Sequence, residues 1–434
     1  MSAFIDRLCN AVLTSASRDE DVRREIGRTV ADTVAVAAAG FAEPVTQSTI
    51  SAYAGAGPRA WNGTAIESRD AAVMVNAVAA HALDFDDVYL DSGSHSSAVI
   101  VPAALTLDDG PSPDMVIDAC AAGLVAARGV GMMLGRKHYQ RGWHATSTVG
   151  VFSATAAAAT IAGLDSIRLR YAFGLAAAMA GGLQLNFSTM AKPAHAGFAA
   201  SAGIRAVRLA ATGVTAADDI FAPGGFGDLY DAENQGEDDD VFALRPDRVA
   251  VKLFPSCYAT SRLIGVALDA RRETGPIFAN ADVTARLTTP AGSLRVLKYD
   301  RPTDGAQAKF SPTFPVAAAL LDGSPVIAHF TAEGVTRSDI ADMIDRLDIV
   351  EDPDRFYDGN LETGSVTLEI FDRDERIVMR ERSAIPGTDA DPVTRDKVRD
   401  KAAGCFAAYR TSFGEDFPLL ARVRAIPEVA HWID

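Results

Sequence analysis

The chain has 434 residues, of which 48% are hydrophobic, so it is long enough for two or three domains with substantial cores. Its formal net charge of −16 argues against a nucleic-acid-binding protein, because such proteins present a basic surface to the phosphate backbone. Only 7% of the residues are aromatic and alanine is abundant, a composition that favours closely packed helices over a β-sandwich.

The cysteines and the N-terminus give no sign of secretion. Four cysteines lie far apart and form no C-x-x-C pair: Cys9, Cys120, Cys257 and Cys405. The chain does not begin with a basic segment followed by a long apolar one, so we expect no signal peptide. The apolar run 151–164 is rich in Ala and Thr and is expected to be too short to span a bilayer. These features predict a cytoplasmic protein with reduced thiols and no membrane contact.

The residues before about position 265 predict a mostly α-helical domain. Apolar residues recur every four positions over 21–39, as in an amphipathic helix, and Gly40 can end that helix. Further helices are expected at 46–54, 69–83, 113–135, 148–162 and 167–181. The acidic stretch 231–240 is expected to be a solvated loop.

The pattern changes after Arg272. Apolar and polar residues alternate in three segments, which predicts strands within 281–297, 364–371 and 375–381, the last two as a hairpin. Helices are expected at 313–321, 338–347 and 397–409. The sequence thus predicts an all-helical domain over 1–265 and 396–434, and a smaller α+β domain over 266–395.

The stretch from Asn76 to Pro102 carries the densest group of reactive side chains. His81 and His95 enclose four carboxylates, those of Asp84, Asp86, Asp87 and Asp91. Such groups are costly to bury without partners, and a junction between a helix and a loop can present them to a ligand. The alternative, that the carboxylates are solvated loop or capping residues and that His95 lies on the surface, stays open at this point.

Two further stretches place a basic side chain beside a helix. His144 precedes a Thr/Ser cluster that can cap the next helix, whose dipole disfavours a charged imidazole there. Lys192 precedes Pro193, which favours an extended conformation, and the following helix is expected to begin at His195. An incidental histidine and a surface lysine are the alternatives.

The stretch from Lys252 to Ser261 contains Lys252-Leu-Phe-Pro-Ser-Cys257. An ordinary loop with Cys257 as a small buried hydrophobic residue is the simplest interpretation.

Together these stretches resemble the MmgE/PrpD family, which includes 2-methylcitrate dehydratases, cis-aconitate decarboxylases and iminodisuccinate epimerases. The resemblance rests on five ordered motifs: His81-Ala-Leu-Asp-Phe-Asp-Asp87 with His95-Ser-Ser97, Gly142-Trp-His-Ala-Thr-Ser147, Lys192-Pro-Ala-His-Ala-Gly197, Lys252-Leu-Phe-Pro255, and Tyr299-Asp-Arg-Pro302. It implies a helical first domain, an α+β lid domain, a homodimer, a di- or tricarboxylate substrate and no organic cofactor.

The sequence agrees with a cofactor-independent protein. It contains no GxGxxG, P-loop or HExxH motif, and Gly224-Gly-Phe-Gly227 lacks the strand–turn–helix context of a nucleotide-binding loop. The Asp/His group around Asp84 could imitate a metal site, but its carboxylate spacing fits no EF-hand loop. We therefore expect neither a metal nor a cofactor.

The resemblance and general chemistry together assign roles. A reaction at a carbon next to a carboxylate needs cations for the carboxylates and a base or an acid near that carbon. We expect Lys192, Lys252 and His81 to bind substrate, and His95 and His144 to be the acid and the base. Asp84 is expected to orient a histidine, and Tyr299 to donate a hydrogen bond from the lid.

Decarboxylase-like members of the family resemble a pattern with two histidines, four residues apart. This chain has Cys257 and Ser261 at those two positions. This departure favours an epimerase of the iminodisuccinate type, in which the Cys257 thiol and an imidazole serve opposite faces of one carbon. A 2-methylcitrate dehydratase-like or cis-aconitate decarboxylase-like lyase is the alternative. A non-catalytic polycarboxylate-binding protein is the alternative of another class.

Overall fold

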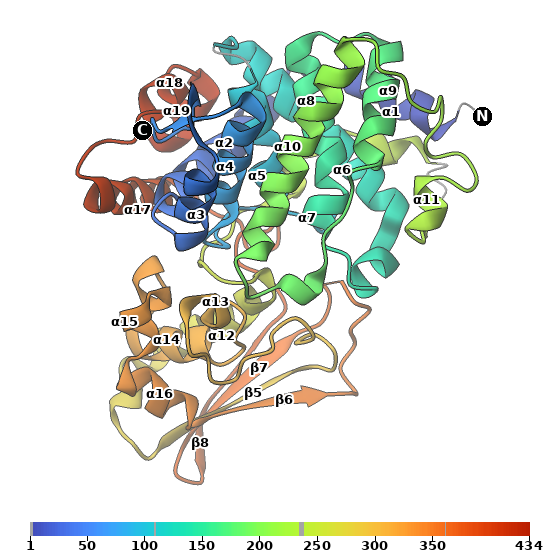
Figure 1. The fold of residues 1–434 in the computed structure, drawn as a ribbon. Coiled ribbons are helices and arrows are strands. Elements are labelled where there is room, and N and C mark those ends of the chain that lie inside the picture. The colour runs from blue at the N-terminus through green and yellow to red at the C-terminus, as the bar shows by residue number, and fades with distance from the viewer. Residues whose placement is uncertain (1–2, 108–109, 234–237, 361) are drawn as a thin grey trace. The chain divides into compact units, whose positions relative to one another are not determined.

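The computed structural model describes residues 3–107, 110–233, 238–360 and 362–434, which form two compact units (Figure 1). The first unit comprises Met1–Leu185, Ala191–Val251 and Thr394–Asp434, and the second comprises Asn186–Met190 and Lys252–Val393. Positions 234–237 of the expected acidic loop lie outside the described residues.

The first unit is almost entirely helical, as the sequence predicts. Its helices are α1 (Phe4–Leu13), α2 (Glu20–Gly40), α3 (Pro44–Ala52), α4 (Arg69–His81), α5 (Ser97–Thr106), α6 (Pro113–Gln140), α7 (Ala145–Thr148), α8 (Gly150–Ala162), α9 (Ser166–Ala177), α10 (Ala191–Ala211), α11 (Phe226–Leu229), α17 (Arg395–Phe413), α18 (Leu420–Arg424) and α19 (Pro427–Ile433). Two antiparallel strand pairs accompany them: β1 (Ala54–Arg59) with β2 (Ala65–Ile66), and β3 (Val88–Tyr89) with β4 (Val249–Ala250). Helices α4, α5, α8 and α10 pack against one another in the centre of this unit (Figure 1).

Small residues let these helices approach closely. A Cβ atom added to Gly40 would lie 1.9 Å from the carbonyl oxygen of Ala79, so α2 and α4 can cross at this distance only because residue 40 is glycine. A Cβ atom added to Gly197 would lie 2.7 Å from the Val78 side chain, which ties α10 to α4 in the same way. These contacts fix α4, the helix that ends at His81.

Among the described residues of the first unit, two helical segments are long and apolar enough to cross a bilayer, α6 and the stretch 145–162. The sequence-based expectation that the second of these runs is too short is wrong, because α7 extends it at its N-terminal end. However, 83% and 89% of the two apolar windows are buried inside the structure, as in core helices of a globular protein.

The second unit is α+β, as the sequence predicts. Its four-stranded sheet has the order β6-β5-β7-β8, formed by β5 (Val283–Pro290), β6 (Leu347–Asp352), β7 (Val366–Asp372) and β8 (Glu375–Arg382). Strand β5 runs parallel to β6 and antiparallel to β7, and β7 and β8 form the predicted hairpin. The helices of this unit are α12 (Ser261–Thr274), α13 (Gly305–Ala308), α14 (Phe314–Asp322), α15 (Ala332–Val335) and α16 (Ser338–Ile344).

The boundary expected at 265/266 falls inside α12, whereas the main segment of the second unit begins at Lys252. Helix α12 packs on α14 and β8 and so belongs wholly to the second unit. The change in sequence pattern after Arg272 therefore marks the end of α12 rather than the start of a domain.

Candidate functional site

The site is built around the C-terminal end of α4 in the first unit. Ser68 caps the start of this helix by accepting a hydrogen bond from the backbone N–H of Ala71, and the helix ends at His81. Beyond it the chain turns sharply at Asp84, whose φ of 50° lies in the left-handed region. His81, Asp84 and Asp86 are only 1%, 3% and 0% exposed. The alternative that these residues are solvated is therefore wrong.

His95 is held by one ring nitrogen and presents the other. Its Nδ1 donates to the backbone carbonyl oxygen of Asp87 at 2.9 Å and lies 3.2 Å from Oδ2 of Asp86. A carbonyl and an ionised carboxylate only accept, so Nδ1 carries the hydrogen. The ring nitrogen that this arrangement leaves for proton exchange is Nε2, which lies 3.8 Å from Oδ1 of Asp84. The backbone N–H of His95 donates to Oγ1 of Thr146, which links this motif to the one around His144.

Lys192 and Asp84 form a buried ion pair beside His81. The lysine Nζ lies 2.8 Å from Oδ2 of Asp84 and 3.1 Å from Nε2 of His81. An ammonium group only donates, so Nε2 of His81 is the acceptor and its Nδ1 carries the hydrogen. That Nδ1 lies 2.8 Å from Oδ2 of Asp86. Burial lowers the pKa of His81 to about 4 against the opposing effect of Asp86, which agrees with a neutral ring.

Asp86 connects the two imidazoles. Burial alone would raise its pKa, but the adjacent rings of His81 and His95 outweigh burial and hold the pKa well below its ordinary value. Asp86 is therefore an ionised, fully buried acceptor for both histidines. By this geometry it orients the rings, a role that the sequence analysis gave to Asp84.

A second pair of imidazoles lies next to the first. The ring centroids of His81 and His144 are 5.9 Å apart, and Nδ1 of His144 lies 3.0 Å from Nδ1 of His195. Burial, followed by the charge of Lys192, holds the pKa of His144 well below its ordinary value and lowers that of His195 to about 4. A neutral His144 was expected from the helix dipole, but burial is the larger cause. Because both rings are neutral, one Nδ1 donates and the other accepts.

Lys192 is not extended, contrary to the expectation from its position before a proline. It lies in the first turn of α10, which begins at Ala191 and not at His195. Proline is tolerated in a first turn because its missing N–H would have no partner within the helix there. The helical start brings Lys192 and His195 onto the same end of α10, beside the end of α4.

Helix α17 of the first unit supports the loop that carries these carboxylates. Lys401 of α17 lies 2.6 Å from Oδ1 of Asp32, donates to the carbonyl oxygen of Phe85 at 2.8 Å and sits 4.1 Å from that ring's centroid. Burial, followed by the charge of Asp32, raises the pKa of Asp87 to about 8. A protonated Asp87 is neutral, so the loop does not place two adjacent buried charges at Asp86 and Asp87.

Ligand atoms of His81, Asp86 and His95 lie within 4.8 Å of one another, a spacing that can hold a metal ion. These atoms already satisfy one another, because Asp86 accepts from both rings. The Lys192 ammonium also lies 3.1 Å from the remaining nitrogen of His81, where it would repel a divalent cation. The donor set therefore fits a hydrogen-bonded acid–base group better than a metal centre.

Three expected site residues belong to the second unit. Lys252 is completely buried there. Cys257 is 8% exposed, and its backbone N–H donates to the carbonyl oxygen of Lys309 at 2.8 Å. The phenolic oxygen of Tyr299 accepts a hydrogen bond from Oγ of Ser188 at 2.9 Å. Their participation in the site around His95 stays a prediction.

The structure thus brings together five expected residues of the first unit, His81, Asp84, His95, His144 and Lys192. The sequence analysis did not select Asp86 and His195, although both lie within the quoted motifs. Asp86 follows His81 by five residues across the turn at Asp84, and this loop path is not periodic. His195 is three residues after Lys192, a spacing that signals a shared helix face once the helix is known to begin at Ala191.

The chain matches known proteins over both units. Residues 6–237 match the MmgE/PrpD N-terminal domain, and residues 254–414 match the MmgE/PrpD C-terminal domain. Cis-aconitate decarboxylase of Mus musculus is 28% identical over 301 residues, which are 65% of this chain and 61% of that protein. Cis-aconitate decarboxylase of Homo sapiens is 25% identical over 318 residues, which are 69% of this chain and 65% of that protein.

A cis-aconitate decarboxylase-like protein of Aspergillus oryzae is 24% identical over 361 residues, 76% of this chain and 74% of that protein. The matched region spans less than two thirds of the length of the mouse and human relatives. The two domain matches cover most of the chain and confirm the family expected from its motifs. The chain belongs to the MmgE/PrpD family.

Proposed function

We propose that this protein is a lyase that acts on a small di- or tricarboxylate by acid–base chemistry at a carbon next to a carboxylate. The observation that carries the proposal is the geometry of His95. Its Nδ1 is held by Asp86 and by the carbonyl oxygen of Asp87, which leaves Nε2 as the atom that exchanges a proton. The named relatives, cis-aconitate decarboxylases, favour a lyase and suggest cis-aconitate as a first substrate to test.

The reaction needs a cation close to the substrate. Loss of CO₂ leaves an electron pair on carbon, and a neighbouring carboxylate can accept that charge only if a positive group stabilises it. A net charge of −16 gives a polyanion no long-range attraction, so the cation must be local. Lys192 is such a group, because its ammonium lies within the cluster of histidines. A substrate carboxylate would compete with Asp84 for it.

The histidines have different roles in the proposed proton transfer. A decarboxylation ends when the carbanion takes up one proton, and His95 can deliver it from Nε2 and regain it from solvent. Asp86 fixes the tautomer and offsets the charge that the ring gains while it is protonated. His144 and His195 are neutral and supply a hydrogen-bond donor and an acceptor within the same cluster. In this proposal Lys252 binds a second carboxylate and Tyr299 donates a hydrogen bond, as their motifs imply.

The epimerase predicted from Cys257 and Ser261 would need a different arrangement of catalytic groups. Inversion at one carbon needs one group on each face, and the thiol would be one of them. The side chains of Cys257 and Ser261 are both buried in the second unit. The names of the relatives do not support an epimerase. The experiment must therefore distinguish epimerisation from the lyase reaction.

The test is proton NMR of the protein with cis-aconitate, citrate, 2-methylcitrate and iminodisuccinate in deuterium oxide. We expect an unsaturated dicarboxylate and CO₂ to form from cis-aconitate, with one deuterium incorporated at the former carbanion. His95→Gln should abolish this, since glutamine cannot exchange a proton. Deuterium exchange or inversion at the α-carbon without decarboxylation or dehydration would favour the epimerase. Binding without any turnover would favour a polycarboxylate-binding protein.

A further inference from the structure

The loop between α4 and α5 carries three side chains that build the cluster of histidines. It comprises residues 82–96, here called the α4–α5 loop, and contains Asp84, Asp86 and His95. Asp86 accepts from the imidazole of His95, and Asp84 pairs with Lys192. The geometry of the cluster therefore depends on what holds this loop in place.

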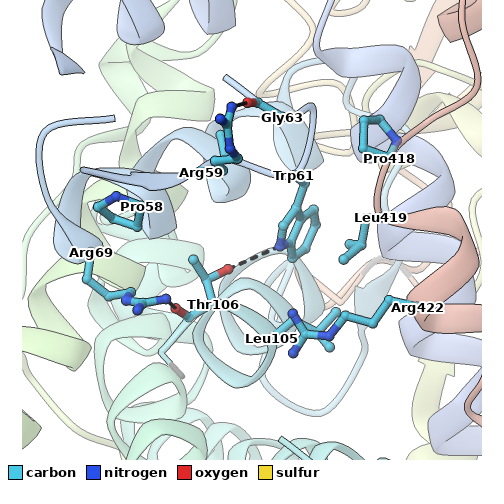
Figure 2. Close-up of a pocket in the computed structure, with 11 residues that line it drawn as sticks. Pro58, Arg59, Trp61, Gly63, Arg69, Leu105, Thr106, Pro418, Leu419 and Arg422 are labelled. Atoms are coloured by element: carbon cyan, nitrogen blue, oxygen red, sulfur yellow. Dashed lines mark hydrogen bonds between the residues drawn. The ribbon is translucent and has the colours of Figure 1, made fainter. Parts of the chain in front are cut away.

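Hydrogen bonds join α4 to α5 at the ends that lie away from this loop. Nε1 of Trp61 donates to Oγ1 of Thr106 at 3.1 Å, and Arg69, the first residue of α4, donates to the carbonyl oxygen of Thr106 at 3.3 Å (Figure 2). Nδ2 of Asn76, within α4, donates to the same hydroxyl oxygen at 3.0 Å. The two helices thus form a fixed frame, and the contacts of the α4–α5 loop itself determine where its side chains lie.

Two arginines hold the part of the α4–α5 loop that leads to His95. Asp91 accepts from Nε of Arg128 at 2.7 Å and from Nε of Arg248 at 2.9 Å. Arg128 lies in α6, and Arg248 directly precedes β4, so two further segments of the first unit meet at this carboxylate. Hydrogen bonds between charged groups are among the strong ones, so this part of the loop is well fixed.

Lys401 holds the other part of the loop, the one that follows α4. Its ammonium donates to the carbonyl oxygen of Phe85 at 2.8 Å and lies 4.1 Å from the centroid of that residue's ring. The preceding residue, Asp84, has a φ of 50°, which a residue other than glycine keeps only where surrounding contacts enforce it. The carbonyl of Phe85 belongs to the planar peptide unit that it shares with Asp86. Lys401 therefore holds the backbone of Asp86 directly.

Lys401 occupies a position of α17 where an apolar residue is expected. Val398, Ala402 and Cys405 are buried, and residue 401 shares their helix face by its spacing. The Lys401 side chain is only 4% exposed, and its Nζ lies 2.6 Å from Oδ1 of Asp32, whose side chain is 1% exposed. Asp32 belongs to α2, which packs against both α4 and α17 (Figure 1).

Stability alone does not account for this buried pair. Removing two charges from water is costly, and an apolar pair of similar volume is often as stable as a buried ion pair or more stable. An apolar side chain at position 401 would fill the same face of α17, but it could not donate to the carbonyl oxygen of Phe85. An ammonium has three donors, so Lys401 can serve Asp32 and Phe85 together.

We infer that Lys401 is a positioning residue for the proposed proton transfer: through the peptide unit between Phe85 and Asp86 it sets the place of the Asp86 carboxylate. Asp32 keeps the ammonium directed at that peptide unit. The role in catalysis rests on the proposed function, whereas the effect on Asp86 does not. Lys401 acts on the reaction through Asp86 and is therefore not itself a catalytic residue.

A displaced Asp86 would change both imidazoles that it orients. Its carboxylate accepts from Nδ1 of His81 at 2.8 Å and lies 3.2 Å from Nδ1 of His95. Hydrogen bonds weaken steeply when their geometry is lost. Loss of the Lys401 contact should therefore loosen both rings, and with the His95 ring the Nε2 atom that exchanges the proton.

The test is proton–nitrogen NMR of the full chain, isotope-labelled at the histidine nitrogens, which shows which ring nitrogens carry a hydrogen and whether it is hydrogen-bonded. The chain has seven histidines, so His81→Gln and His95→Gln can assign the two Nδ1–H signals. Both should lie at low field in the wild type because Asp86 accepts from them. Lys401→Met should shift or broaden both signals. It should also lower kcat about 10–100-fold, as a misplacement of about 1 Å can.

Lys401→Met also leaves Asp32 as a buried charge, so stability needs a separate measurement. The double variant Asp32→Asn/Lys401→Met leaves no unpaired charge and should regain part of the thermal midpoint that the single variant loses. It still lacks the donor to Phe85, so its histidine signals and its kcat should stay altered. Lys397→Met is the matched control, because it makes the same substitution at an exposed lysine of α17 and should change none of the three readouts.

The inference is overturned if the wild-type histidine signals persist in Lys401→Met or in the double variant, whatever kcat does. Recovery of the wild-type signals and kcat together with the thermal midpoint would show that the pair only stabilises the fold. Equal changes in Lys397→Met would overturn the inference as well. Where the single variant does not fold, the double variant carries the same test. The spectra need no substrate, so absence of lyase activity would refute the proposed function and leave the test of Lys401 intact.

Discussion

Nζ of Lys192 lies 2.8 Å from Oδ2 of Asp84, and both side chains are at most 5% exposed. The two residues come from α10 and from the turn after α4, so their ion pair joins two segments that are distant in sequence. Removing one partner leaves the other as a buried charge without its counter-ion, which costs about 3–5 kcal/mol in comparable cases.

We therefore predict that Asp84→Asn lowers the free energy of unfolding by about 3–5 kcal/mol, measured by urea denaturation. The double variant Asp84→Asn/Lys192→Met should recover part of this loss, because it leaves no unpaired charge. Asp70→Asn, which breaks a surface pair with Arg208, is the matched control and should cost about 1 kcal/mol or less. Equal losses at Asp84 and Asp70 would contradict the buried ion pair.

The second prediction concerns Asp86, which accepts hydrogen bonds from both His81 and His95. Asparagine keeps the size of the side chain but offers its amide N–H₂ to one ring, which forces that ring into the other tautomer. In the proposed lyase, Asp86→Asn should lower kcat by about 10²–10⁴-fold, by analogy with the same change behind a catalytic histidine. KM should change much less, and the pH profile of kcat should shift.

Asp86→Glu keeps the carboxylate and should restore part of the activity of Asp86→Asn. A purely structural role would instead lower the thermal midpoint of both variants to the same extent and leave the pH profile in place. Circular dichroism melting and steady-state kinetics of the two variants, measured side by side, separate these cases.

The dependence of stability on pH is the third prediction. Burial lowers the pKa of His81, His138 and His195 to about 4 each, below the ordinary value of 6.5. Between pH 4 and 6.5 the unfolded chain therefore binds more protons, and the folded state gains stability as the pH rises. Asp87 acts in the opposite direction, because its pKa is raised to about 8. Its folded carboxyl keeps a proton that the unfolded one has lost, so stability falls as the pH rises toward 8.

The sum of these effects places maximum stability near pH 6.5, with a steep fall on the acid side and a shallower one on the alkaline side. Urea unfolding at half-unit intervals from pH 4 to 9 measures this curve. Asp87→Asn should flatten the alkaline side and steepen the acid side, because Asp87 opposes the histidines from about pH 4 upward. An alkaline slope that survives this change would show that another group causes it.

Much of the helical architecture could be predicted from local pattern. Helices α2 and α17 carry periodic apolar residues, and the hairpin of β7 and β8 alternates over both strands. Strand β6 was missed because it is short and carries three acidic residues, so that its pairing with β5 depends on the neighbouring strand and not on its own pattern. The start of α10 was missed because a proline usually ends a helix, whereas in a first turn it is accepted.

Five residues of the cluster could be selected from the sequence, but Asp86, His195 and the arrangement of the group could not. The motif around His81 keeps its reactive groups within one short stretch, but spacing alone left a solvated loop open, and the family resemblance was needed to select it. The contact between His144 and His195, and that between Lys401 and Asp32, join segments far apart in the chain through helix packing. The burial that lowers the pKa of His144 also arises only in the folded first unit.

The fourth prediction concerns metals. His81, Asp86 and His95 have a spacing that suits a cation, yet the adjacent Lys192 ammonium repels one. Turnover should therefore be unchanged after exhaustive dialysis against EDTA. Lys192→Met removes the repulsion, so it should bind zinc more tightly than the wild type in a competition assay with a chromogenic chelator. Activity that is lost on chelation and restored by one divalent ion would instead identify a metal centre.

The last prediction separates the lyase from the epimerase expected from the sequence. If the reaction is a decarboxylation that uses His95, Cys257→Ser should change kcat by less than about threefold, because the thiol takes no part in that reaction and serine is of similar size. His144→Gln should lower kcat by about tenfold or more, since it removes a neutral imidazole of the cluster and with it the hydrogen bond to His195. An epimerase with bases on two faces predicts the reverse for the thiol. In that case Cys257→Ser would abolish deuterium uptake from one stereoisomer of the substrate while His144→Gln abolished it from the other, and the lyase assignment would be replaced.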